Sequence, residues 1–198
     1  RQALTTLIDR YGQYPGVRVY AKSAIARIYR VEQRWEDAVR TFQELAELDP
    51  WSDSGLDAPL QVAIIYENLQ HKEDAATAWH KAIARYEDLI ERAPSLPIRH
   101  RVMWFLAEAY QLTGQWERAA QELEALLDAP GFTEQPFFGP PDVLFRLGAI
   151  YQTLNWPHRT REVMAKLVEQ YPNHHLARNA RQWLAAFDES GAKSTATP

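Results

Sequence analysis

One pattern of five positions occurs four times in this chain and constrains its fold more than any other feature. Each copy is built on a tyrosine, with a large aliphatic residue four positions before it and a small residue three positions before it. A second small residue (threonine in the last copy) follows nine positions after the tyrosine, and a bulky residue lies four positions further on. The copies are Ile25–Phe42, Val62–Trp79, Leu106–Leu123 and Leu147–Met164. Such spacings place the residues on single helix faces, so the pattern predicts helix pairs packed through small-residue contacts.

Turn and stop residues separate the predicted helices. The turns within the pairs are expected at Gln33, Gln70, Gly114 and Asn155. Glycine and asparagine suit a left-handed helix terminus, whereas glutamine does so poorly. A proline ends or closely follows each second helix, at Pro50, Pro94, Pro130 and Pro172. Only 8 glycines are present, a low number for a chain of short strands and tight turns, so we expect ten helices and no strand.

Residues 25–50 and 105–127 carry the pattern most completely. They read IARIYRVEQRWEDAVRTFQELAELDP and FLAEAYQLTGQWERAAQELEALL. Both resemble the tetratricopeptide repeat, and the resemblance covers roughly residues 17–188. It implies an all-α, right-handed α-solenoid of about four helix pairs, with an N-terminal half-repeat and a C-terminal closing helix. A weaker resemblance, carried by residues 7–15 and 167–185, is to envelope proteins such as the Tol-Pal coordinating protein and the barrel-assembly lipoproteins.

The repeats divide the chain into seven expected segments. These are a half-repeat helix (1–16), a first repeat (17–50), a second repeat with an extended second helix (51–94), a third repeat (95–130), an insertion loop with a fourth repeat (131–172), a closing helix (173–188) and a flexible tail (189–198). The extra length between repeats maps to Trp51–Asp57, to a second helix reaching Arg92, and to Gly131–Pro140. Because a half-repeat follows Arg1 directly, we interpret the chain as a piece of a longer protein.

Composition narrows the classes of partner. The 26 acidic residues against 22 basic ones give a formal charge of −4, without the basic excess that a phosphate backbone attracts, so we do not expect nucleic acid. No apolar run is long enough to span a membrane. The absence of cysteine fits an oxidising compartment, although many cytosolic chains also lack it. We favour a periplasmic or envelope-associated location over a cytoplasmic one.

Motifs for catalysis are missing from the sequence. The 6 histidines show no ligand spacing on one helix. Asp49, Asp53 and Asp57 flank Gly55 without matching a calcium loop, so helix capping is the better interpretation. Neither a glycine-rich phosphate loop nor a nucleophile elbow occurs. We therefore predict no enzyme activity, no metal and no cofactor.

The resemblance implies that the first helix of each pair lines a concave face that grips a protein or peptide partner. It places at the centre of this face, or flanking it, Leu60, Ile64, Trp104, Phe145, Arg27, Arg101 and Arg146. Aromatic anchors beside arginine are common in binding hot spots, so we predict that Trp104 is at least partly exposed and contacts the partner. The alternative is that Trp104 and Phe145 only pack between repeats. The lysine and asparagine clamp with which some members of this family bind chaperone C-termini is absent from these slots.

Two further questions stay open at this point. The proline-rich segment 131–141 carries Phe132, Phe137 and Phe138, which either form a functional loop or cover the junction of the third and fourth repeats. Covering is the more common behaviour of such phenylalanines. The chain as a whole is either a binding scaffold or an oligomerisation or regulatory module of a larger protein whose activity lies elsewhere.

Overall fold

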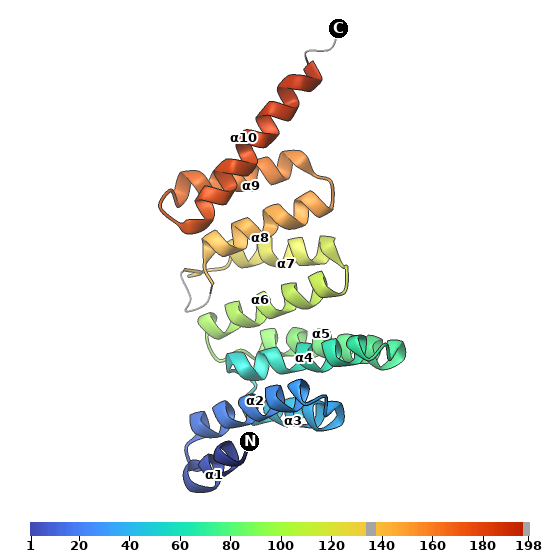
Figure 1. Ribbon diagram of the computed structural model, residues 1–198. Coiled ribbons are helices and arrows are strands. Elements are labelled where there is room, and N and C mark those ends of the chain that lie inside the picture. The colour runs from blue at the N-terminus through green and yellow to red at the C-terminus, as the bar shows by residue number, and fades with distance from the viewer. Residues whose placement is uncertain (134–137, 196–198) are drawn as a thin grey trace. The chain divides into compact units, whose positions relative to one another are not determined.

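The computed structural model describes the backbone of residues 1–133 and 138–195, with side chains in this range up to Asp188. Over these residues the chain forms ten α-helices and no strand (Figure 1), which confirms the predicted all-α class. The helices divide into two compact units, the N-terminal unit (residues 1–93) and the C-terminal unit (residues 94–198). Phe137 lies outside the described residues.

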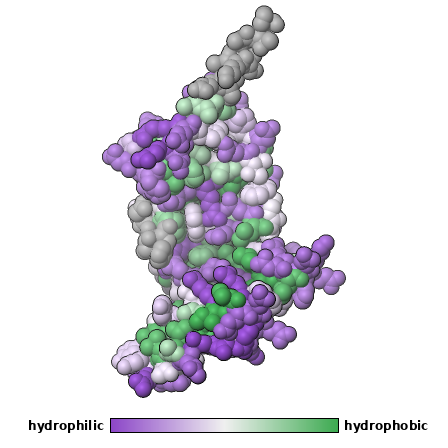
Figure 2. All heavy atoms as spheres, viewed as in Figure 1, coloured by the Kyte–Doolittle hydropathy of each residue, from purple (hydrophilic) through white to green (hydrophobic). Residues whose placement is uncertain are grey.

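The N-terminal unit contains five helices, each packed on the next. They are α1 (Gln2–Tyr11), α2 (Pro15–Val31), α3 (Trp35–Leu48), α4 (Asp53–Asn68) and α5 (Lys72–Arg92). The last of these is 21 residues long and ends where the sequence predicted the end of an extended second helix. Over this unit, Figure 2 shows apolar side chains gathered among hydrophilic ones.

The C-terminal unit also contains five helices. They are α6 (Leu96–Leu112), α7 (Trp116–Leu127), α8 (Pro140–Thr153), α9 (Pro157–Gln170) and α10 (His175–Thr195). Contacts join α6 to α7, α7 to α8, α8 to α9, and α10 to both α8 and α9. Where α8, α9 and α10 meet, the core is a buried cluster of Leu144, Met164, Leu167 and Ala180.

The small positions of the repeat pattern are buried in both units. They are Ala26, Ala38, Ala63, Ala75, Ala107, Ala119, Gly148 and Thr160. The bulky residues that follow them are buried as well, namely Phe42, Trp79, Leu123 and Met164. At Gly148 an added Cβ would overlap the end of the Met164 side chain. Small residues therefore allow the close helix contacts, and large ones fill the space beside them.

Each helix pair turns through one residue in the left-handed conformation. These are the four predicted residues Gln33, Gln70, Gly114 and Asn155, with φ of 58°, 60°, 72° and 56°. At every turn the next residue donates its N–H to the carbonyl of the repeat's tyrosine, as Arg34 does to Tyr29 at 2.8 Å. This bond belongs to a Schellman motif, which satisfies the last carbonyls of the helix. For a glutamine the left-handed conformation costs about 1–2 kcal/mol, so packing of the pair must hold two of the four turns.

A serine, and not one of the aspartates proposed from the sequence, caps α4. The Ser52 hydroxyl accepts a hydrogen bond from the Gly55 N–H at 3.2 Å. Gly55 is buried, and an added Cβ would overlap the Asp49 carbonyl, so only glycine fits this close approach. Most of the expected insertion Trp51–Asp57 therefore forms the first turn of α4 and not a separate connection.

The two end helices differ from expectation in one respect. At the N-terminus, α1 is a single helix with no fully buried residue, as a half-repeat would be. At the C-terminus, α10 continues to Thr195, seven residues beyond the expected end of the closing helix at 188, and the flexibility of the tail stays a prediction. No proline stops this helix before Pro198. A helix already anchored to the core can extend at little cost, because only its first turn is expensive to form.

Candidate protein-binding surfaces

Trp104 of α6 lies in a cluster of side chains from its own helix, from α8 and from the segment just before α8. Its ring stacks on Phe138, with the centroids 4.7 Å apart and the planes 16° from parallel. The guanidinium carbon of Arg146 lies 4.4 Å from the centroid of the Trp104 ring. Arg146 is held in turn by an ion pair with Glu108 at 3.8 Å and a hydrogen bond to the Gln111 side chain. The indole is therefore only partly exposed and is fixed in orientation.

The charge of Arg146 is partly shielded from water. Its side chain is 19% exposed. Burial lowers the pKa of the guanidinium, and the nearby Glu108 carboxylate opposes this shift. The group still carries its proton at neutral pH, because the pKa of arginine is so high. Trp104 and Arg146, both predicted as binding residues, thus form one aromatic and cationic cluster within the C-terminal unit.

The described phenylalanines of the 131–141 segment pack against α6. Phe132 and Phe138 have ring centroids 5.9 Å apart, and Phe132 also meets the edge of the His100 ring at 5.4 Å. Phe138 is buried. The two rings therefore cover α6 and support Trp104, as in the interpretation that these residues cover their neighbours; Phe137 lies outside the described residues.

His100 is the most deeply buried histidine among the described residues, with 1% of its surface exposed. Within the described part of the chain, neither ring nitrogen makes a hydrogen bond of good geometry. Burial lowers the pKa of His100, the neighbouring Arg99 lowers it further, and the Pro130 carbonyl partly offsets both. The imidazole is therefore a neutral part of the core at neutral pH.

Two other predicted residues of the C-terminal unit are also partly buried. Phe145 packs against the cluster of Leu144, Met164, Leu167 and Ala180. Arg101 lies half-buried on the same helix as Trp104. Phe145 is thus mainly a contributor to the core, which is the alternative that the sequence left open for it.

The predicted residues of the N-terminal unit are distributed differently. Leu60 is only 1% exposed, so its assignment as a partner contact is wrong. The cause is that α4 packs against α2, α3 and α5, which cover this position. Ile64 is half-buried and Arg27 is exposed, so both remain available. A single groove that joins them to Trp104 remains a prediction.

Comparison with known proteins places these helix pairs in a family. Tetratricopeptide repeat models match residues 21–54 and residues 142–174. The structure is similar to a thermophilic tetratricopeptide repeat protein from Thermus thermophilus, with 18% sequence identity and a TM-score of 0.57 over 93% of this chain and 88% of that one. It is also similar to a putative kinesin light chain with nearly identical repeats from Podosopora anserina, with 19% identity and a TM-score of 0.60 over 91% and 89% of the two chains. No curated protein has a sequence similar enough to count as a relative.

The chain contains tetratricopeptide repeats, matched over residues 21–54 and 142–174. The first match confirms the resemblance proposed from residues 25–50, and the similar structures confirm the class of all-α repeat solenoids. At these identities the solved structures show the fold alone, and the right-handed sense of the solenoid and the envelope resemblance stay predictions. Tetratricopeptide repeats support the function of a protein–protein interaction scaffold, on a fold that is typical of non-enzymatic proteins.

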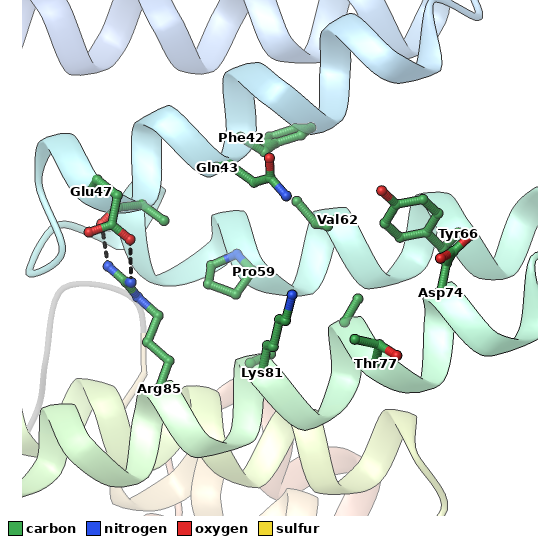
Figure 3. Close-up of a pocket in the computed structure, with 13 residues that line it drawn as sticks. Phe42, Gln43, Glu47, Pro59, Val62, Tyr66, Asp74, Thr77, Lys81 and Arg85 are labelled. Atoms are coloured by element: carbon green, nitrogen blue, oxygen red, sulfur yellow. Dashed lines mark hydrogen bonds and ion pairs between the residues drawn. The ribbon is translucent and has the colours of Figure 1, made fainter.

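The tetratricopeptide repeats of the N-terminal unit also form a groove that the sequence did not predict. This second-helix groove has a volume of about 340 Å³ and lies between the second helices α3 and α5, with the first helix α4 beneath them (Figure 3). Pro59 and Val62 of α4 form its apolar floor, and Lys81 reaches over them from α5. At one end Arg85 pairs with Glu47 at 2.6 Å and closes the groove.

The sequence does contain residues that indicate this groove, but they lie on the second helices of the pairs. The family expectation directs attention to the first helices, whereas the groove is walled by the second ones. Its walls include three alanines, Ala46, Ala78 and Ala82. Small side chains on facing helices leave space between them unless a larger residue fills it.

The described part of the chain holds neither a metal-binding cluster nor a membrane-spanning helix. Within residues 1–133 and 138–188, no three histidine, aspartate or glutamate side chains lie close enough together to hold a metal ion. Over the described helices, none combines the length and the apolar character needed to cross a membrane.

Proposed function

We propose that this tetratricopeptide scaffold binds a peptide or helix of a partner protein, with Trp104 and Arg146 as its anchor in the C-terminal unit. The observation that supports the proposal is the partly exposed indole between Phe138 and Arg146. Hot spots of protein interfaces are enriched in tryptophan and arginine. A side chain already held in place loses little freedom on binding, so more of its contact energy appears as affinity.

The indole of Trp104 and the guanidinium of Arg146 determine which chemical groups of a partner can bind here. The indole offers an apolar and aromatic surface, and the guanidinium offers hydrogen-bond donors to a carboxylate or a carbonyl. Glu108 already shares Arg146, so a neutral acceptor such as a backbone carbonyl fits this position better than a second full charge. A partner segment with an apolar side chain next to an exposed carbonyl meets both conditions.

Replacement of Trp104 tests the anchor. A pull-down with the whole chain identifies the partner, and its affinity is then measured for Trp104→Ala and for Arg146→Lys. We expect Trp104→Ala to weaken binding by about 2 kcal/mol, about thirtyfold. Arg146→Lys keeps the charge but loses the planar contact with the ring, so it should also weaken binding. Trp156 of the same unit, 36% exposed, provides the matched control Trp156→Ala.

Thermal melts of the same variants decide between an anchor and a core residue. A deletion of a buried tryptophan costs about 3–5 kcal/mol of folding stability. If Trp104→Ala loses that much while Arg146→Lys binds like the wild type, the cluster has only a packing role and the proposal fails.

A second candidate is self-association through α1. No residue of α1 is fully buried, and three tyrosines near it are exposed, Tyr11, Tyr14 and Tyr20 at 48%, 58% and 66%. Aromatic residues on an uncovered helix face favour an interface. Sedimentation of the chain with and without residues 1–12 distinguishes this candidate, because only self-association predicts a mass that falls by half.

A further inference from the structure

The second-helix groove has a smaller structural counterpart in the C-terminal unit, with which its lining can be compared. The counterpart is a hollow of about 260 Å³ lined by α7, α8 and α9. Equivalent positions are found by counting from the repeat tyrosines Tyr66 and Tyr151. Lys81 follows Tyr66 by 15 positions (66 + 15 = 81), and Lys166 follows Tyr151 by 15 (151 + 15 = 166).

The groove is larger than its counterpart, and three equivalent apolar side chains in its lining are smaller. Three equivalent positions carry Ala46, Val62 and Ala78 in the groove and Leu127, Leu147 and Val163 in the C-terminal hollow. Each pair differs by at least one carbon atom. No side chain from elsewhere in the N-terminal unit fills the space, since about 340 Å³ remains between the helices.

Polar bridges across the C-terminal hollow are missing from the groove. In the hollow, Glu124 accepts hydrogen bonds from the Tyr151 hydroxyl and from Arg159, the latter at 2.7 Å. The groove has Gln43 in place of Glu124 (29 + 14 = 43; 110 + 14 = 124) and Asp74 in place of Arg159 (66 + 8 = 74; 151 + 8 = 159). Neither side chain makes such a bridge within the described residues. Gln43 and Asp74 therefore leave the walls α3 and α5 unbridged above the apolar floor, and Arg85 joins these walls only at one end of the groove.

Lys81 is the uncompensated charge next to that floor. In Figure 3 its amino group points toward Pro59 and Val62, and it makes no ion pair within the residues that the structure describes. Arg85 is neutralised by Glu47. Asp74 is two turns along α5 from Lys81 (81 − 74 = 7), is 63% exposed, and faces His71 at 3.5 Å.

The groove continues beyond Gln43 and Tyr66. A second hollow, of about 710 Å³, shares these two residues and extends toward Trp35 and Leu69. Both hollows lie within the N-terminal unit. An extended shape of this kind fits a length of polypeptide better than a compact small molecule.

We propose that the second-helix groove binds a short extended segment of a partner protein that presents an aliphatic side chain next to an acidic one. The aliphatic side chain lies on Pro59 and Val62, between Ala46 and Ala78. The carboxylate pairs with Lys81 at the edge of the same apolar surface, where partial removal from water strengthens the attraction. This surface is made by residues other than those of the Trp104 cluster, so it is a second binding site on the scaffold.

Three synthetic fluorescein-labelled peptides on a common serine and glutamine background test the proposal with the whole chain. The first carries a leucine and a glutamate two positions apart, the spacing at which side chains of an extended peptide face the same way. In the second peptide lysine replaces the glutamate, and in the third serine replaces the leucine. Fluorescence anisotropy should show binding of the first peptide, with the other two weaker by about tenfold or more.

Variants of the protein place the binding in the groove. Lys81→Glu should reverse the preference, so that the lysine peptide binds better than the glutamate peptide. The double variant Ala46→Leu with Ala78→Val installs large side chains close to those of the C-terminal hollow, and it should abolish binding. Lys166→Glu is the matched control in that hollow and should leave all affinities unchanged. The proposal is overturned if the glutamate peptide binds no tighter than about 1 mM, or if Lys81→Glu leaves the preference as it was.

A dye attached at one position of the groove shows directly whether the peptide binds there. Because the chain has no cysteine, Thr77→Cys in the groove and Glu162→Cys at the equivalent position (66 + 11 = 77; 151 + 11 = 162) can each carry an environment-sensitive dye. The first peptide should shift the emission of the Thr77→Cys label and not that of the Glu162→Cys label. A shift at Thr77→Cys that depends on protein concentration without any peptide means that a second copy of this chain covers the groove, and the proposal is then wrong.

Discussion

Acidification should destabilise the protein through His100, and replacement of this one histidine should remove the effect. The imidazole is 1% exposed, has no hydrogen bond of good geometry and meets the Phe132 ring at 5.4 Å. Protonation would place a charge in this apolar contact beside Arg99, which disfavours it further. Burial therefore holds the pKa of folded His100 below the 6.5 of an unperturbed histidine.

The sign and the size of the effect follow from linkage. Between the lowered pKa of the folded state and pH 6.5, the unfolded chain binds a proton that the native chain does not. His100 therefore does not lower the free energy of unfolding well above pH 6.5, and it lowers this free energy increasingly as the pH falls through 6.5. The slope is at most about 1.4 kcal/mol per pH unit for one proton. From pH 6.5 to about pH 5 the loss from His100 is at most about 2 kcal/mol.

Urea denaturation followed by circular dichroism at about pH 5 and about pH 7.5 measures this loss. Other groups also titrate in this range, so the comparison is between variants. His100→Leu should lose less stability on acidification than the wild type, and at neutral pH it should be at least as stable, because a buried polar group without a good partner is removed. His80→Leu, at an exposed position of α5, should behave like the wild type. Equal losses for wild type and His100→Leu would refute the reasoning.

Two further predictions concern the repeat framework. Ala119 is fully buried at a helix contact, so Ala119→Leu should lower the free energy of unfolding by about 1–3 kcal/mol. The control Ala125→Leu, on the exposed side of α7, should change it little. An unchanged melting temperature for Ala119→Leu would contradict the assigned helix register. Gln70 has a φ of 60°, so Gln70→Gly should raise the stability by about 1 kcal/mol, and urea denaturation would count against this if the variant is less stable.

The Trp104 cluster could be predicted from the sequence only in part. The repeat spacing put Trp104 on a first helix and Arg146 on the next first helix of its unit, and the structure brings the two within 4.4 Å. The stacking of Phe138 on Trp104 could not be derived, because it depends on the path of a long connection. The interpretation of Leu60 was wrong for a different reason. Its position on the helix was correct, but its burial depends on three neighbouring helices.

The sequence by itself determined the helix pairs, the four turns and the buried small positions such as Ala38 and Ala119. These features depend on the period of the helix and on residue size, which a chain of letters records directly. Only the tertiary structure decided that His100 is buried without a good partner and that the second-helix groove is open. Both depend on whether side chains from non-adjacent segments are large enough to fill a given space, and that depends on how the helices pack in three dimensions.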